Sequence, residues 1–270
     1  MSEAKSNKFM LGVATVMIGP RAELYDLNPD THSVGLVKNF TSEASKSRTD
    51  LTGGRTNEII FTMTTGSTTR ATFEMYEYTA KNMSYALGLS GASLVPTTGD
   101  PWVLTAVSTG TAGAFTLVAT VPATLQTIVN GGFVMVRQPS NNNILLAKVV
   151  DATGQSTGDI DIQLDPSFTG SLAIGTVISA VNVLEIGSTE GDTDLACKVS
   201  GQLADGTWVT LLYPKIRITS GLNLSFSTDN FNNIPFEFTP LKLFAGEDFY
   251  ADFSGHSAKL LLDTVKSALV

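Results

Sequence analysis

Apolar and polar residues alternate with a period of two along most of this sequence, and this alternation limits the possible folds more than any other feature. Such a pattern is typical of β-strands with one buried face. The 34 threonines agree with it, because β-branched side chains pack well on a pleated surface. The sequence therefore predicts a mostly β protein built of antiparallel sheet. The clearest runs are Ile59–Thr64, Phe73–Tyr76, Asp159–Leu164, Lys215–Ile218, Leu222–Ser227 and Ile234–Phe238.

Two local signals refine this prediction. Asp205-Gly206 lies between two strand-like runs and predicts a tight hairpin turn, because such turns need a residue with positive φ. From Thr79 to Gly88 the spacing becomes that of a short amphipathic helix. Threonine is a favoured residue before the first helical turn and glycine a favoured one after the last. The apolar face of this helix is predicted to carry Ala80, Met83 and Leu87.

Both ends of the chain contain apolar segments. Phe9–Ile18 follows two lysines, as in a signal peptide, but no small-x-small cleavage pattern comes after it. This segment is also too short to span a bilayer, so we expect a buried strand and no membrane anchor. The last segment, Ser257–Val270, suits either a buried strand or a terminal helix.

Charged residues are distributed unevenly along the chain. Residues 97–185 hold 2 basic and 6 acidic groups, whereas residues 1–96 hold 9 of each and residues 186–270 hold 6 and 10. Turn-rich polar segments bound the weakly charged middle, as linkers often do. We expect residues 1–96 and 187–270 to form one discontinuous β-sandwich domain, with residues 97–186 as an inserted small β domain. One continuous sandwich is the alternative.

The composition argues against several kinds of function. A net charge of -8 and a pI near 4.7 disfavour binding to nucleic-acid phosphates, because Lys and Arg provide that affinity. Cys197 is the only cysteine, so it cannot form an intramolecular disulfide or a multi-cysteine zinc site, and we expect a small buried residue. The common phosphate-binding, zinc-protease and acyl-transfer motifs are absent. We therefore expect a non-enzymatic protein that needs no metal or cofactor.

A few ionisable residues remain as candidates for chemistry. Asp159 with Asp161, and Asp192 with Asp194, each place two carboxylates on one strand face, as at the start of a calcium site or in a glycosidase pair. No third oxygen ligand completes either pair, so solvated strand faces are the simpler interpretation. His32 lies in a turn-like segment and is expected to be an exposed loop residue.

Thr41–Asn57 is a long polar segment with a single large apolar residue, and it lies between strands that end near Phe40 and begin near Glu58. We expect a 17-residue loop, and loops of this length inside a compact domain are usually functional or disordered. Its mixed charges suit a salt-bridging contact with another copy of the chain or with a partner. A solvated hairpin tip is the alternative. The candidate contact residues are Glu43, Lys46, Arg48, Asp50 and Arg55.

The order of these features resembles that of a known family, the major tail tube protein of long-tailed bacteriophages. The resemblance covers about residues 9–95 and 195–265. The middle of the chain has no counterpart in a minimal family member, although tail proteins often carry inserted β domains. The segments that carry the resemblance are Gly35–Phe40, Glu58–Thr64, Arg70–Tyr78, Thr79–Gly88 and Ser227–Phe238.

This resemblance implies a tail-tube-type β-sandwich or barrel with one flanking short helix. Such proteins close into hexameric rings through a shared β-barrel, and the rings stack into a tube through which DNA passes without specific binding. Tape-measure and tail terminator proteins are the other implied partners, and the implied location is the virion tail after production in the bacterial host cytoplasm. Residues 41–57 correspond to the loop that reaches neighbouring subunits and rings. The tube wall is expected to be acidic, which the net charge of -8 also favours.

Two other functions fit the residues. The chain can be a two-domain β binding module for receptor or glycan recognition, similar to an adhesin, with residues 97–185 holding the ligand. A β-sandwich glycosidase would instead use two acidic residues such as Asp159 and Asp161. Polymerisation of the purified protein distinguishes the tail tube hypothesis from both.

Overall fold

The computed structural model divides the chain into two compact units, which we call unit 1 (Met1–Gly91 with Ile186–Val270) and unit 2 (Ala92–Glu185). β-Strands are the main secondary structure of both units, with 52% strand against 8% helix, so the predicted mostly β fold class is confirmed. The structure describes residues 14–53, 56–90, 99–121, 126, 128–139, 144–165, 168, 170–184, 186, 193–224 and 232–263.

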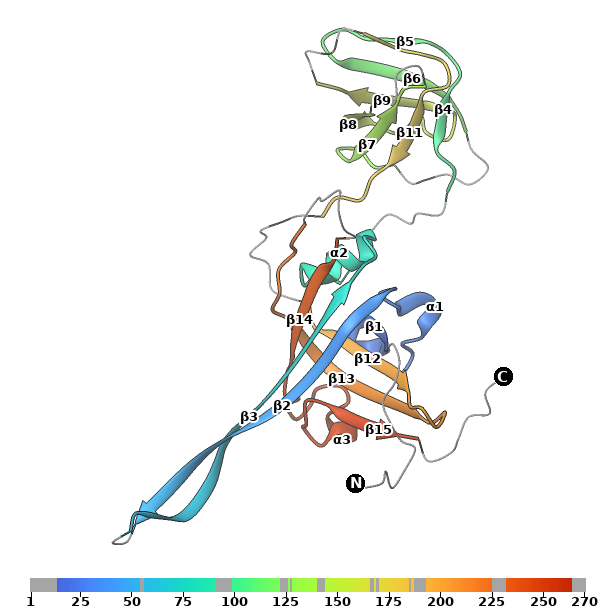
Figure 1. Cartoon of the computed structure of the whole chain (residues 1–270). Coiled ribbons are helices and arrows are strands. Elements are labelled where there is room, and N and C mark those ends of the chain that lie inside the picture. Colours follow the sequence, from blue (N-terminus) through green and yellow to red (C-terminus); the bar gives the residue numbers. More distant parts are fainter. Residues whose placement is uncertain are drawn as a thin grey trace. The chain divides into compact units, whose positions relative to one another are not determined.

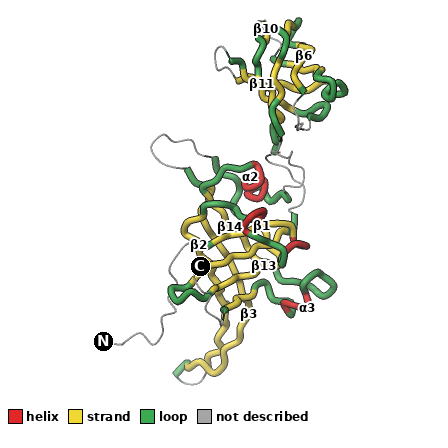
Figure 2. Tube along the Cα trace, turned by 90° about the vertical axis from the view of Figure 1, so that its right-hand side faces the viewer, coloured by secondary structure: helices red, strands yellow, loops and turns green. Residues whose placement is uncertain are grey.

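Unit 1 is built on one antiparallel sheet with the strand order β1-β12-β13-β14-β3-β2, and β15 pairs with β13 beside this path. Figure 1 shows these strands together with the hairpin of β2 and β3. Figure 2 shows the same hairpin continuing beyond the other strands of the sheet. The strands are β1 (Thr15–Pro20), β2 (Val37–Gly53), β3 (Glu58–Met75), β12 (Leu195–Gln202), β13 (Trp208–Ile218), β14 (Ile234–Pro240) and β15 (Lys259–Leu262).

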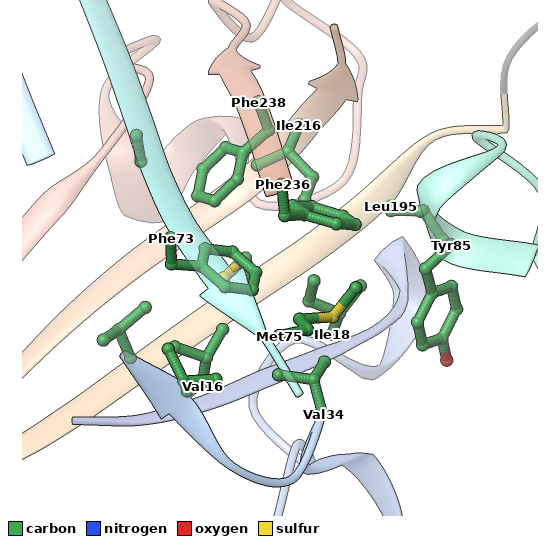
Figure 3. Close-up of a cluster of buried hydrophobic side chains, with 14 of the residues drawn as sticks. Val16, Ile18, Val34, Phe73, Met75, Tyr85, Leu195, Ile216, Phe236 and Phe238 are labelled. Carbon is green, nitrogen blue, oxygen red and sulfur yellow. The ribbon is translucent and has the colours of Figure 1, made fainter. Parts of the chain in front are cut away.

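The core of unit 1 collects apolar side chains from every strand of the β1-to-β2 path. Phe73 stacks on Phe236 with ring centroids 4.8 Å apart, and Phe238 meets Phe73 edge-on (Figure 3). Aromatic pairs of this kind contribute about 0.5–1.5 kcal/mol beyond their buried area. Phe73 and Met75 are buried, as are Ile234 and the phenylalanines of β14. The alternation predicted for these two strands is therefore confirmed.

The predicted helix is α2 (Ala80–Ala86), and it begins after Thr79, whose hydroxyl accepts a 3.1 Å hydrogen bond from the backbone N–H of Asn82. Its buried face differs from the prediction, because Tyr85 and Asn82 point inward while Met83 is only partly buried. Burial of Asn82 is possible because its amide donates to the carbonyl oxygens of Val34 and Glu77. Both of these bonds are 2.9 Å long.

The predicted hairpin turn joins β12 and β13. Gly206 has a φ of 85°, and the backbone N–H of Thr207 donates to the carboxylate of Asp205. At the N-terminal end, the predicted strand is observed as β1 for residues 15–20, whereas residues 9–13 lie outside the described part of the chain. At the C-terminal end, β15 shows that residues 259–262 are a strand rather than a helix.

In the described part of unit 1, three further short helical segments flank the sheet. The sequence patterns did not predict these segments. They are η1 (Arg21–Glu23, a 3₁₀ helix), α1 (Pro29–His32) and α3 (Tyr250–Phe253). A second apolar cluster includes Met17 of β1, Ala196 of β12 and Phe253 of α3, so the sheet buries side chains on both faces here. Among the described residues, no helix is both long enough and apolar enough to cross a membrane.

Unit 2 contains a closed six-stranded barrel with the order β11-β4-β6-β9-β8-β7 and a separate two-stranded sheet of β5 and β10. Its core includes Trp102, which is fully buried, and the alternating residues Ile160, Ile162 and Leu164. The alternation predicted for this segment is confirmed. The strands are β4 (Trp102–Leu104), β5 (Ser108–Thr109), β6 (Ala114–Thr120), β7 (Phe133–Arg137), β8 (Ile144–Asp151), β9 (Asp159–Gln163), β10 (Ser171–Leu172) and β11 (Val177–Ala180).

Candidate interaction surface

The β2–β3 hairpin extends well past the sheet to which it belongs. Its strands hold 17 and 18 residues, and their pairing runs from Val37 opposite Met75 at the base to Gly53 opposite Glu58 at the far end. The neighbouring strand β14 pairs with β3 only over Ala71–Met75. Figure 1 shows the remaining part of the hairpin extending away from the rest of unit 1 as a two-stranded ribbon.

The prediction of a loop over Thr41–Asn57 is wrong. Residues up to Gly53 continue β2 and pair with β3, with register irregularities at three places. Residues 56 and 57 form a turn before Glu58, and residues 54 and 55 lie outside the described part of the chain. The segment lacks apolar alternation because both of its faces are exposed in the single chain, and alternation reports burial rather than backbone pairing.

The far end of the hairpin carries exposed apolar side chains, and we call this set the apolar tip. Phe61 lies opposite Leu51 and shares a face with Met63, whereas the register shift after Leu51 pairs Ile59 with Thr52 on the other face. The buried face predicted for residues 59–64 is therefore wrong for the single chain. Contiguous exposed apolar patches often mark interaction sites. The apolar tip consists of Leu51 (61% exposed), Ile59 (61%), Ile60 (67%), Phe61 (59%) and Met63 (54%).

The predicted contact residues lie along the same hairpin. Four of the five are exposed on β2, and the ion pairs found within the described residues include none of them. The hydroxyl of Thr62 donates a 2.6 Å hydrogen bond to Asp50 across the two strands. Arg55 lies outside the described residues, and the role of the set in binding another chain stays a prediction. The four are Glu43, Lys46, Arg48 and Asp50.

Polar contacts attach the base of the hairpin to the sheet. The hydroxyl oxygens of Ser42 and Tyr213 are 2.7 Å apart, and Arg70 forms an ion pair with Glu237 of β14. The Arg70 guanidinium lowers the pKa of Glu237, so this carboxylate is ionised at neutral pH. The outward face of these strands is mixed in charge, and the expected acidic tube wall stays a prediction. Its charged residues include Lys38, Glu43, Arg70, Glu74, Arg217 and Glu237.

An apolar groove with a volume of about 330 Å³ lies beside the base of the hairpin. Residues of β2, β12, β13 and β15 line it. Gly201 is part of its wall, and a Cβ added at Gly201 would meet nothing within 4 Å. The groove is therefore open at this glycine. Its apolar lining residues are Ala14, Phe40, Val199, Leu203, Val209, Leu211 and Leu260.

Two strands of unit 1 have unpaired edges. Over the residues that the structure describes, β2 pairs only with β3 and β15 only with β13, whereas β1, at the other end of the sheet, also forms an isolated bridge from Met17 to Ser33. Every residue of β15 is exposed, including Leu260, Leu261 and Leu262. An exposed strand edge presents free N–H and C=O groups that can pair with another chain. The hairpin, the groove and these edges are therefore all suited to contacts with a further protein chain.

The acidic pairs singled out in the sequence do not assemble into a metal centre in the described part of the chain, where no group of three or more His, Cys, Asp or Glu residues is placed to hold a metal. Asp159 and Asp161 lie on β9 of the barrel. Asp194 instead forms an ion pair with Lys215 at 3.2 Å. Asp192 lies outside the described residues.

His32 and Cys197 both lie in packed positions of unit 1. The prediction of an exposed loop position for His32 is wrong, because His32 ends α1, its side chain is only 13% exposed and its Nε2 lies 2.9 Å from Oε2 of Glu23. Cys197 is fully buried in the unit 1 core, as predicted. Burial raises the pKa of its thiol, which disfavours the thiolate needed for nucleophilic chemistry.

Comparison with known proteins does not assign the chain to a family. A scan against protein-family models finds no match, and no curated protein matches the chain. The inference of function therefore depends on the surfaces described above and on the resemblance carried by the order of sequence segments.

Proposed function

We propose that this chain is a non-enzymatic structural protein that assembles with copies of itself into hexameric rings, which stack to form the tail tube of a long-tailed bacteriophage. The observation that carries the proposal is the apolar tip at the end of the β2–β3 hairpin. Its five side chains are each more than half exposed. Apolar surface that stays exposed to water is unfavourable. A long ribbon with an apolar end therefore suits a chain whose tip is buried by neighbouring copies.

Open strand edges support the same proposal. A ring of identical subunits can close when one surface of each copy binds a different surface of the next. The unpaired edge of β2 and the unpaired edge of β15 are two such surfaces, both within unit 1. Pairing between subunits would satisfy backbone groups that the single chain leaves open to water.

The charge of the chain fits a conduit for DNA. A net charge of -8 disfavours adhesion to phosphates and permits DNA to move along the wall. In this proposal the tube contacts tape-measure and tail terminator proteins inside the virion tail, and it needs no cofactor.

Shortening the hairpin tests the proposal. Ser45 and Thr68 are cross-strand partners with hydroxyl oxygens 2.7 Å apart, so an Asn-Gly turn between them removes residues 46–67 at a position where the strands are already paired. The removed residues are exposed wherever the structure describes them, except Gly53. We expect the shortened chain to fold, with an unfolding midpoint close to that of the full-length chain, but to form no tubes in negative-stain electron microscopy.

Two outcomes contradict the proposal. Full-length protein that stays monomeric at high concentration would argue against self-assembly altogether. Normal tubes from the shortened chain would show that assembly does not use the hairpin.

A further inference from the structure

The apolar tip cannot reach the groove of its own chain. Phe40, at the base of β2, lines the groove, and Leu51 of the tip lies on the same strand. The eleven steps between them span about 36 Å at the rise of ~3.3 Å per residue of a strand. Because β2 remains paired with β3 across this distance, the hairpin would have to lose its pairing to fold back.

The groove offers the tip a suitable partner surface. Both are apolar, and the groove volume of about 330 Å³ is in the ~300–1,000 Å³ range of pockets that enclose small ligands. The open space at Gly201 leaves room for a side chain that comes from outside. Phe61 has the largest apolar side chain of the tip, and Met63 and the cross-strand partner Leu51 lie on the same face.

A free strand edge lies next to the groove. Leu260 of β15 is one of the lining residues, and β15 has no strand on its second side among the described residues. An arriving hairpin can therefore add its backbone to this edge while its side chains enter a pocket, which is a recurring mode of peptide recognition.

We infer that the apolar tip of one copy docks into the β15-bordered groove of a second copy, with Phe61 as the central side chain. This inference rests on the proposed self-assembly and names the surface that receives the hairpin. Tip and groove are different surfaces of one chain, so the contact can repeat head-to-tail from copy to copy, which is the arrangement that the proposed rings require.

One such contact is expected to be weak. The four tip residues other than Ile59, which faces the opposite side, expose roughly 400 Å² in total, if each side chain offers ~150–200 Å² and 54–67% of it is exposed. Stable two-chain interfaces usually bury about 1,200–2,000 Å² counted over both partners. Many copies held in one assembly compensate for weak single contacts, so assembly should depend steeply on protein concentration.

Filling the groove is the first test. Gly201→Leu places a side chain in the open space, and Gly201 does not have the positive φ that would strain a leucine. Gly221→Leu is a matched control. A Cβ there also meets nothing within 4 Å, but Gly221 does not line the groove. We expect Gly201→Leu to raise the concentration needed for assembly more than tenfold and Gly221→Leu to leave it unchanged. Equal assembly of the two variants would overturn the inference.

Cross-linking is the second test, and it does not depend on how a variant packs. Protein with Phe61→Cys is mixed with protein that carries Leu260→Cys, and the native Cys197 does not interfere because it is buried. We expect a disulfide-linked heterodimer under mild oxidation. Phe61→Cys mixed with Phe244→Cys, which is exposed at a position that does not line the groove, should give none.

The outcomes separate this inference from the proposed function. Tubes without the Phe61–Leu260 cross-link would overturn the docking inference and leave the tail tube proposal standing. Phe61→Cys that links only to itself would indicate tip-to-tip contact, and it would overturn the docking inference alone. A cross-link blocked because residues 1–13 of the same chain fill the groove would do the same. Absence of any assembly under electron microscopy would overturn both.

Discussion

Replacing Phe61 with threonine is expected to weaken assembly without weakening the fold. Threonine has a β-branched side chain that suits a strand, so the hairpin should keep its pairing. Phe61 is 59% exposed in the single chain, and substitutions at such positions usually change the free energy of unfolding by less than about 0.5 kcal/mol. The same side chain becomes important only when a second copy covers it.

The size of the effect follows from the exposed area. A phenylalanine offers ~200 Å² for burial, so the exposed 59% of Phe61 leaves roughly 120 Å² to be covered by a partner. At ~25 cal/mol per Å² this covering contributes about 3 kcal/mol. Threonine recovers part of it through its methyl group, which leaves a loss of about 2 kcal/mol, or roughly 30-fold in the dissociation constant of one contact.

Sedimentation velocity over a concentration series measures this shift, and urea unfolding of each variant checks the fold. Phe244→Thr is the matched control, since it removes another exposed phenylalanine (68%) that lies between β14 and α3 rather than on the hairpin. We expect wild-type assembly from the control. If Phe61→Thr assembles at the wild-type concentration, or if both variants are weakened equally, the reasoning about the tip is wrong.

Three further predictions concern unit 1 itself. Phe236→Ala should lower the free energy of unfolding in urea by about 3–5 kcal/mol, because Phe236 is buried against Phe73; a loss below about 1 kcal/mol would contradict the packing described. Lys215 lowers the pKa of Glu247 from 4.5 to about 2, so the ionised carboxylate stabilises the fold above pH 4.5, and this contribution is lost as the pH falls toward 2. The midpoint temperature of thermal unfolding should therefore fall less steeply between pH 7 and pH 2 in Glu247→Gln than in the wild type. Parallel plots of this midpoint against pH would refute the prediction. Cys197 should react with a thiol reagent only as fast as the chain unfolds, so rapid reaction of native protein would contradict its burial.

Sequence patterns predicted several strands whose inward side chains are covered within the same chain, but the run Leu222–Ser227 was wrong at residues 222–224, which form no strand. The inward residues of β14 and β9 are buried where the alternation placed them, and the turn at Gly206 has the positive φ that its glycine suggested. Helix α2 begins after Thr79 as predicted. Its buried face was not predictable from apolar spacing, because the polar Asn82 is buried with a hydrogen bond to the backbone carbonyl of Val34, which is distant in the sequence.

The hairpin shows the limit of this reasoning. Alternation in residues 59–64 correctly indicated a strand, but it does not say whether the covering surface belongs to the same chain. The other strand has no alternation around Lys46–Asp50, because both faces are exposed there, and it was interpreted as a loop. The extended polar strand is held by its register with β3, which a single-sequence pattern does not reveal.

The groove was not predicted at all. It arises where β2 comes together with β12, β13 and β15, and β2 is separated from these three strands by more than 140 residues. Gly201 is the one local sign, because a glycine inside a strand often marks a close approach of another group. The glycine alone does not predict a groove, and only the structure shows the open space around Gly201.

Electron microscopy of the purified protein over a concentration series shows whether the chain assembles in the proposed way. We expect rings with six-fold rotational symmetry that stack into tubes as the concentration rises, with the hairpins lying in the contacts between subunits. Particles that remain monomeric at high concentration, or that form only closed two-fold dimers, would contradict this expectation.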